Sequence, residues 1–184
     1  RDVKLLRQTV KTKLILEMAS TEEMLRIARD IKPDLVTLVP ETAEEVSTEG
    51  GLDLLTHKES VSLSVKRLRD AGIPVSIFID PDMDQIQVAA DIHADMIEIH
   101  TGSFCDAPDQ ASKDREFSKI VDSSKFAVRL GLGVNAGHGI CYDSVGHSCA
   151  IAQPYAYARS VALHIGRQGA KPHVLMPIIR SCGG

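Results

Sequence analysis

The chain has 184 residues, enough for one domain with a sizeable core, because about 150 residues already bury about two-thirds of their surface on folding. Hydrophobic residues make up 43% of the sequence and charged residues 25%, as is ordinary for a globular protein. A net charge of -4 gives no electrostatic reason to expect a nucleic-acid or anionic-membrane partner, and no apolar stretch approaches the roughly 20 residues of a membrane span.

Helical patterns alternate with short apolar runs along the chain. Helices are expected over the opening residues, and then around residues 24–31, 61–68, 86–90 and 117–128. The expected helix starts are Ser20, with Glu23 as its capping-box partner, and Asp80, which precedes a proline. Gly72 and Gly131 stand where helices should stop. This alternation predicts parallel strands joined by right-handed helical crossovers.

Five apolar runs each lead into a polar residue at their carboxyl end. The runs are residues 14–16, 35–39, 75–79, 96–99 and 133–134, and the polar residues that follow are Glu17, Glu41, Asp80, His100 and Asn135. Binding sites in β/α barrels and open α/β sheets occupy the carboxyl ends of the strands. The sequence therefore predicts an α/β enzyme whose chemistry gathers at one edge of its sheet.

The number of strands is small for a closed barrel, which needs about 250 residues. The sequence fits either an open sheet or a TIM (β/α)8 barrel that is incomplete, with about five recognisable βα units. The chain begins at Arg1, directly in a helical pattern and without an initiator methionine. This start favours a barrel that lacks its first units.

Four acidic or basic residues at or near strand ends are weighed as site residues. Glu17 follows three aliphatic residues, so its carboxyl group is expected to be partly buried, either for proton transfer or in a structural ion pair. Glu98 and His100 lie two apart on one strand and so share a face, which would be the inside of a barrel. We favour a satisfied Glu–His pair there over a direct chemical role, and we favour a capping role for Asp80.

The segment GVNAGHG, residues 133–139, is the sharpest local feature. Its glycines allow a tight turn and close approach of the backbone to a ligand. His138, flanked by glycines just after a strand, is better placed for acid–base work than for packing, although a structural turn with an exposed histidine is the alternative. The loop at residues 47–51 pairs two hydroxyls with two glycines and could bind phosphate.

Metal binding is disfavoured. His100, Cys105, His138 and Cys141 could in principle share a metal ion, but their proximity in sequence fixes no geometry. The four cysteines show no CxxC spacing, which predicts a reduced, cytoplasmic protein.

Taken together, these residues resemble the pyridoxine 5'-phosphate synthase family of deoxyxylulose-dependent vitamin B6 biosynthesis. The matching stretches, in the order of the family, are RDVKLLRQTV, LEMASTEEML, KPDLVTLVPE, VSTEGGLD, RLRDAGIPVSIFID, IEIHTG and GVNAGHG. They run from Arg1 to about residue 144, and a match of this length and density is far more specific than any single motif.

The resemblance implies a (β/α)8 barrel that condenses 1-deoxy-D-xylulose 5-phosphate with 3-amino-2-oxopropyl phosphate, and it implies no metal or organic cofactor. It places Glu17 at the acid–base glutamate of the family and His138 at its proton-donating histidine. Gly139 would contribute to the substrate site, and Ser47 takes the position of a substrate-binding threonine while keeping the hydroxyl. Members of the family usually assemble into homo-octamers.

The sequence departs from the family pattern in two places, and these departures determine the domain organisation that we expect. The opening strands of the family are absent, and with them one proposed acid–base group and part of the phosphate site. After residue 145 the resemblance stops, so we expect a partial barrel domain over residues 1–145 and a divergent segment of uncertain structure over residues 146–184. The alternative function is a catalytically inactive barrel fragment that binds phosphorylated ligands or sister subunits.

Overall fold

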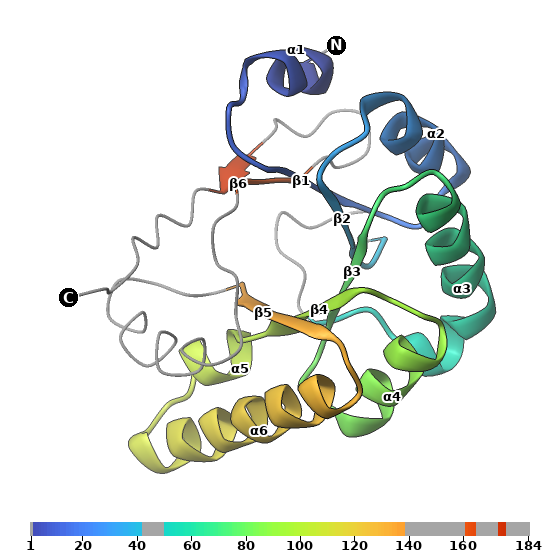
Figure 1. Ribbon diagram of the computed structural model, residues 1–184. Coiled ribbons are helices and arrows are strands. Elements are labelled where there is room, and N and C mark those ends of the chain that lie inside the picture. The colour runs from blue at the N-terminus through green and yellow to red at the C-terminus, as the bar shows by residue number, and fades with distance from the viewer. Residues whose placement is uncertain (1, 42–49, 139–160, 165–172, 176–184) are drawn as a thin grey trace.

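A computed structural model of the protein describes residues 2–41, 50–138, 161–164 and 173–175 (Figure 1). The helices are α1 (Asp2–Thr9), α2 (Glu22–Ile31), α3 (Leu54–Asp70), α4 (Met83–Asp91), α5 (Gly102–Cys105) and α6 (Gln110–Arg129). The strands are β1 (Leu14–Met18), β2 (Leu35–Leu38), β3 (Val75–Ile79), β4 (Met96–His100), β5 (Gly133–Gly137), β6 (Val161–His164) and β7 (His173–Leu175). All five predicted strands and all five predicted helices are confirmed.

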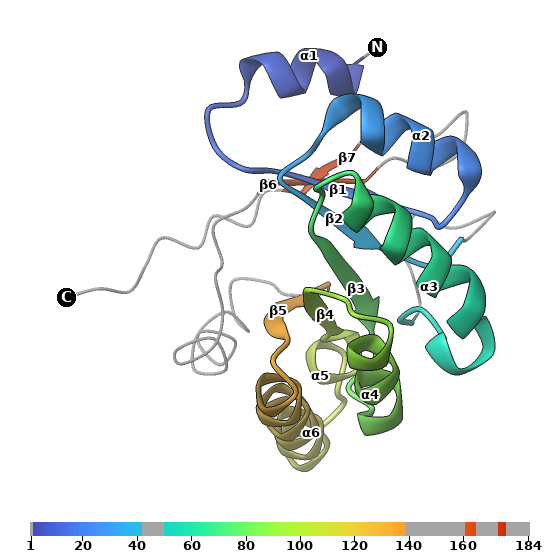
Figure 2. The same cartoon turned by 45° about the vertical axis from the view of Figure 1, so that its right-hand side comes forward.

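The strands form a single sheet in the order β5-β4-β3-β2-β1-β6-β7. Each of the strands β1 to β4 pairs in parallel with the next one along the chain, so the crossovers between these five strands all run in the same direction. With right-handed crossovers, this sequential order places the connecting helices on one face of the sheet, as in a barrel and unlike a doubly wound sheet. Figures 1 and 2 show α2, α3, α4 and α6 along the outside of the curved sheet. The chain is thus an incomplete β/α barrel, as predicted.

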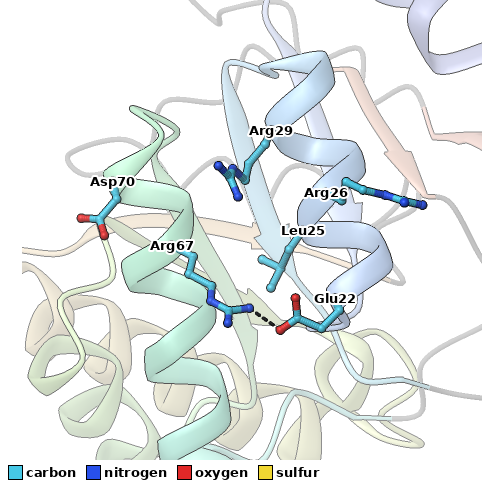
Figure 3. A pocket seen from close by; sticks show the side chains of 6 residues that line it. All are labelled: Glu22, Leu25, Arg26, Arg29, Arg67 and Asp70. Atoms are coloured by element: carbon cyan, nitrogen blue, oxygen red, sulfur yellow. Dashed lines mark hydrogen bonds and ion pairs between the residues drawn. The ribbon is translucent and has the colours of Figure 1, made fainter.

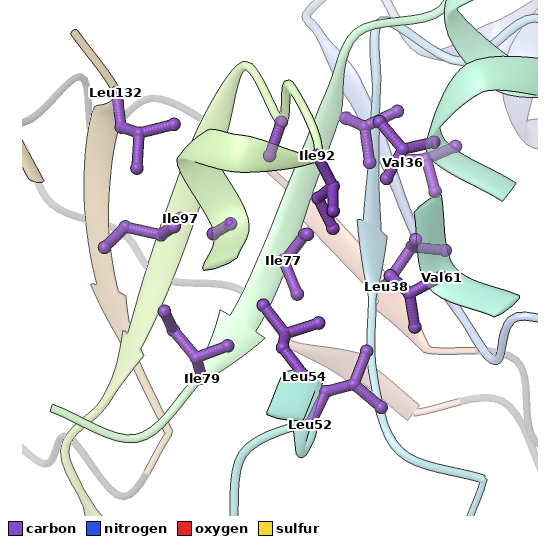
Figure 4. Packing of buried hydrophobic residues seen from close by; sticks show 14 of the residues in the cluster. Val36, Leu38, Leu52, Leu54, Val61, Ile77, Ile79, Ile92, Ile97 and Leu132 are labelled. Carbon is purple, nitrogen blue, oxygen red and sulfur yellow. The ribbon is translucent and has the colours of Figure 1, made fainter. Parts of the chain in front are cut away.

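The hydrophobic core lies between the sheet and these helices (Figure 4). Alternate strand residues point toward the helices, among them Val36, Leu38, Ile77, Ile79 and Ile97. Side chains of neighbouring residues in a strand point to opposite faces, so the polar residues between them line the inner face of the sheet. This alternation places Glu98 and His100 inside and Ile97 outside, in agreement with the prediction.

Two helices end just before the glycines that were predicted to stop them. Gly72 and Gly131, just beyond the ends of α3 and α6, have φ angles of 76° and 85°, which residues with a Cβ adopt at a cost. No helix within the described ranges combines the length and the apolar character that a membrane span requires.

Two predicted caps are wrong by one or two residues. The N-cap of α2 is Thr21, whose hydroxyl accepts from the Met24 backbone N–H, while the neighbouring Ser20 hydroxyl contacts the Ser64 hydroxyl on α3. The N-cap of α4 is Asp82, not Asp80. Asp80 is unavailable for capping because its carboxylate bonds to His100 and to the Gly51 backbone.

Two strands late in the chain were not predicted. β6 pairs in parallel with β1, with His164 in register with Glu17, and β7 pairs antiparallel with β6. The predicted division into domains at residue 145 stays a prediction.

Replacing the α4 cap by alanine should destabilise the protein. The Asp82 carboxylate accepts backbone N–H bonds from Asp84 (2.8 Å) and Gln85 (3.0 Å). We expect Asp82→Ala to lower the free energy of unfolding by about 0.5–2 kcal/mol, whereas Asp82→Asn keeps the acceptor and should cost far less. Urea unfolding of the two variants measures the difference, and equal losses would contradict the capping role.

Candidate functional site

The inner face of the sheet carries three rows of side chains, defined by the strand register. The rows, from the centre toward the carboxyl edge, are Glu17, Thr37, Ser76 and Met96; then Phe78, Glu98 and Asn135; then His100 and Gly137. Ionisable groups from β1 and β4 therefore face the same interior, although they are far apart in the sequence. The predicted gathering of polar groups at this edge is confirmed for these residues.

His138 follows β5 directly and completes the cluster. Its φ angle is 72°, in the left-handed region, which marks a sharp turn of the backbone at the strand end. Its ring lies 5.0 Å from the His100 ring and 5.8 Å from the Phe78 ring, measured between centroids, and the His100 and Phe78 rings are 5.2 Å apart. Three rings from β3, β4 and the end of β5 thus pack edge to face or tilted.

The backbone of the His138 turn is tied to the end of β4. The buried Thr101 accounts for this, because its backbone N–H and its hydroxyl both bond to the Gly137 carbonyl, at 3.0 Å and 2.9 Å. The same hydroxyl also contacts the His138 carbonyl. A rigid turn of this kind holds a histidine in one place for proton transfer.

The predicted close approach at the glycine-rich segment is visible at Gly137. A Cβ atom built on Gly137 would lie 2.2 Å from Glu98 Oε1, closer than any real contact. The absence of a side chain on Gly137 therefore leaves room for the Glu98 carboxyl group beside the His138 turn.

Two carboxyl groups share the interior, and they affect each other. Desolvation raises the pKa of the half-buried Glu98 to about 8, and the negative charge of Glu17 adds to the effect. At neutral pH Glu98 is therefore mostly protonated and can donate a hydrogen bond or a proton. A carboxyl group that stays protonated at neutral pH beside a second carboxyl group is typical of acid–base sites.

His138 is held toward its neutral form. Desolvation lowers its pKa, and the positive charge that His100 can carry lowers it further, while Glu17 and Asp106 act in the opposite direction. A neutral imidazole at pH 7 can accept a proton, and it can return that proton in a later step.

Three buried polar atoms on the same inner face have no hydrogen-bond partner among the described residues. They are Thr37 Oγ1, Ser76 Oγ and Asn135 Oδ1. Buried polar groups are nearly always satisfied in native proteins, so each of these atoms calls for a partner such as a water molecule or a ligand group. They lie in the rows that contain Glu17 and Glu98, which makes the interior below the carboxyl edge polar.

The arrangement differs from the expected Glu98–His100 pair. His100 Nδ1 is 2.9 Å from Asp80 Oδ1, so its partner is on the neighbouring strand end. Sequence reasoning therefore undervalued both Asp80 and Glu98. The position of Asp80 directly after a strand was the available signal, but the proline that follows it suggested a cap.

Ser47 and Gly139, the two predicted substrate-binding residues, lie outside the described residues. In the described part of the chain, no group of three His, Cys, Asp or Glu side chains is arranged to hold a metal ion.

A pocket of about 380 Å³ lies elsewhere, on the helical outside of the sheet (Figure 3). It is lined by Glu22, Leu25, Arg26, Arg29, Arg67 and Asp70 of α2 and α3. Glu22 and Arg67 form an ion pair across it. Because the pocket opens away from the inner face, we do not assign the candidate site to it.

The fold and the inner-face acid–base groups are typical of barrel enzymes. Among solved structures, the chain is similar to the tryptophan synthase A-subunit of the hyperthermophile Pyrococcus furiosus, with a TM-score of 0.54 and 15% identity over 88% of this chain and 60% of that chain. At this identity the likeness shows the barrel-type fold alone.

Comparison of the sequence identifies the family. The chain belongs to the family described as pyridoxal phosphate biosynthesis protein PdxJ, which matches residues 1–163. It is 58% identical over 145 residues to the pyridoxine 5'-phosphate synthase of Desulforapulum autotrophicum, and 55% identical over 145 residues to that of Geotalea uraniireducens. Each alignment covers 79% of this chain and 61% of the relative, so the aligned region spans about three-fifths of the length of these relatives.

The raised pKa of Glu98 predicts a pH-dependent stability. The native state binds a proton at Glu98 that the unfolded chain has already lost, so the contribution of this group to the free energy of unfolding falls as the pH rises from about 4.5 to about 8. Glu98→Gln, which mimics the protonated form, should remove this decline and be more stable than the wild type at pH 8–9. The exposed Glu59→Gln is the matched control. Parallel pH profiles for Glu98→Gln and the wild type in urea unfolding would contradict the assignment.

Proposed function

We propose that the protein acts as a pyridoxine 5'-phosphate synthase. In this reaction 3-amino-2-oxopropyl phosphate and 1-deoxy-D-xylulose 5-phosphate condense to pyridoxine 5'-phosphate, inorganic phosphate and water. The observation that carries the proposal is the grouping of Glu17, Glu98, His100 and His138 at the inner carboxyl edge of a PdxJ-family sheet.

The chemistry requires repeated proton transfers, which the cluster can supply. Attack of the amine on the ketone needs a group that removes a proton from nitrogen, and loss of water needs a group that protonates the leaving hydroxyl. We assign acid–base work to Glu17 and proton donation to His138, which first accepts the proton because it is held toward its neutral form. The protonated Glu98 supports an oxygen on which negative charge develops.

Binding of the phosphorylated substrates is assigned to two residues that the family resemblance singles out. Ser47 and Gly139 are proposed to contact the phosphorylated substrates through a hydroxyl group and a backbone amide. The oxygen atoms of Thr37, Ser76 and Asn135 that lack a partner among the described residues can form hydrogen bonds with substrate hydroxyl groups and with water in this interior. We further propose that the protein works in the cytoplasm as a homo-oligomer, as the family resemblance implies.

A turnover assay tests the proposal. The purified chain is incubated with both phosphorylated substrates, and pyridoxine 5'-phosphate is detected by mass. Product above the uncatalysed background supports the synthase function. Absence of product from a chain shown by circular dichroism to be folded would overturn it, and binding of either substrate in that case would favour the inactive, ligand-binding barrel.

A further inference from the structure

Asp80 occupies a junction between three parts of the site. It lies just beyond the end of β3, and its Oδ1 atom is 2.9 Å from His100 Nδ1 on β4. The same oxygen accepts the backbone N–H of Gly51 at 3.2 Å. One carboxylate oxygen therefore holds both a histidine of the cluster and the backbone that leads into α3.

The contact at Gly51 is close and specific. A Cβ atom on Gly51 would lie 2.3 Å from the Asp80 backbone nitrogen, so only glycine fits against the end of β3 at this point. The next residue, Leu52, donates its backbone N–H to the Phe78 carbonyl at 2.7 Å. Residues 50–52 are thus seated on the end of β3, beside the rings of the cluster.

The His100 side chain is buried, with 7% of its surface exposed, whereas the Asp80 side chain is 52% exposed. The His100 ring is fixed from several sides. Asp80 holds Nδ1, a Cβ atom on Gly102 would lie 2.6 Å from Nε2, and the rings of Phe78 and His138 pack against it. A buried histidine whose Nδ1 faces a carboxylate has a fixed ring orientation and a stabilised positive charge.

We propose that Asp80 is a positioning residue of the site, which holds the His100 ring in place and acts through it on the neighbouring His138. The inference rests on the proposed function for its catalytic meaning, but its physical content can be tested without substrate. Among the described residues, the charged or titratable groups that act on His138 are His100 on β4, Glu17 on β1 and Asp106 after α5. Asp80 acts through the first of these.

The direction in which the pKa of His138 changes shows whether Asp80 acts on it through His100 or directly. Asp80→Asn removes the negative charge but keeps an oxygen that can accept the Gly51 N–H. Without the Asp80 charge beside it, a positive charge on His100 is less favoured and repels a proton on His138 less. The pKa of His138 is therefore expected to rise, by about 0.5 of a pH unit for charges about 5 Å apart in a water-like medium. If the Asp80 charge acted directly on His138, its removal would lower the pKa of His138 instead.

The experiment is an NMR titration of the full 184-residue chain with isotopically labelled histidines. The exposed His57 and His93, on α3 and after α4, are internal controls whose titration should not move. Asp84→Asn, an equal charge change at an exposed position of α4, is the matched control variant. We expect an upward shift at His138 in Asp80→Asn only.

A second variant keeps the test independent of any folding defect in the first. His100→Asn retains an N–H donor for Asp80 and removes the ring charge, so it should raise the pKa of His138 as well. Adding Asp80→Asn to it should then produce no further rise, because both changes act on one route. A downward or absent shift in Asp80→Asn, or an additive rise in the double variant, would overturn the proposal whether or not the chain turns over substrate.

Discussion

Glu17→Gln is expected to reduce formation of pyridoxine 5'-phosphate by about 10²- to 10⁴-fold, the range for loss of a positioned acid–base group. Glutamine has nearly the same shape but cannot take up a proton at the pH of the reaction. Glu17 lies on β1, which pairs with β2. Its charge acts on both Glu98 and His138. No other described carboxylate influences both of these groups. The measurement is single-turnover and steady-state product formation by mass.

The fold of Glu17→Gln should be unchanged, because the strand register and the packing of Leu16 and Met18 on the helices do not involve the charge. Glu23→Gln, at an exposed position of α2, is the control and should retain full activity. Near-normal turnover by Glu17→Gln would remove Glu17 from the mechanism.

His138→Asn is the second substitution with a large expected effect. Asparagine tolerates the left-handed backbone conformation that His138 adopts, so the turn should persist while the imidazole is lost. We expect product formation to fall by about 10²- to 10⁴-fold, and the free energy of unfolding to fall by about 0.5–1.5 kcal/mol through loss of the ring contacts with Phe78 and His100.

A second substitution at His138 distinguishes the loss of the imidazole from the cost of the left-handed backbone conformation. His138→Ala loses the ring as well, but alanine tolerates a φ of 72° less well than asparagine, so His138→Ala should be less stable than His138→Asn by about 1–2 kcal/mol. Urea unfolding and the turnover assay, applied to both variants, distinguish the two effects. Equal stability of the two variants, or full activity in His138→Asn, would contradict the account.

The strands and their orientation could be predicted because each has a short apolar run that ends in a polar residue. The alternation within β4 placed Ile97 toward the helices and Glu98 toward the interior, which depends only on the period of a strand. The family resemblance then identified Glu17 and His138 as members of one site.

Local patterns could not assign the partners of the site residues. The sequence predicted Asp80 as the cap of α4, whereas Asp82 caps this helix and Asp80 is bonded to His100 across the strand ends. The effect of Glu17 on Glu98 arises from the curvature of the sheet, which brings β1 and β4 to one interior. β6, which pairs with β1, was not predicted from the sequence. It has only four residues and lies in a segment interrupted by prolines, so it shows no periodic pattern of its own.

The measurement that tests the central claim most directly is an NMR titration of the histidine-labelled chain with 1-deoxy-D-xylulose 5-phosphate. The claim is that substrate binds at the inner carboxyl edge of the sheet, beside His100 and His138. The account predicts saturable shifts of these two histidines and none for His57 and His93, which lie on the helical outside. Shifts confined to His57 or His93, or no shift at His100 and His138 in a folded chain, would contradict it.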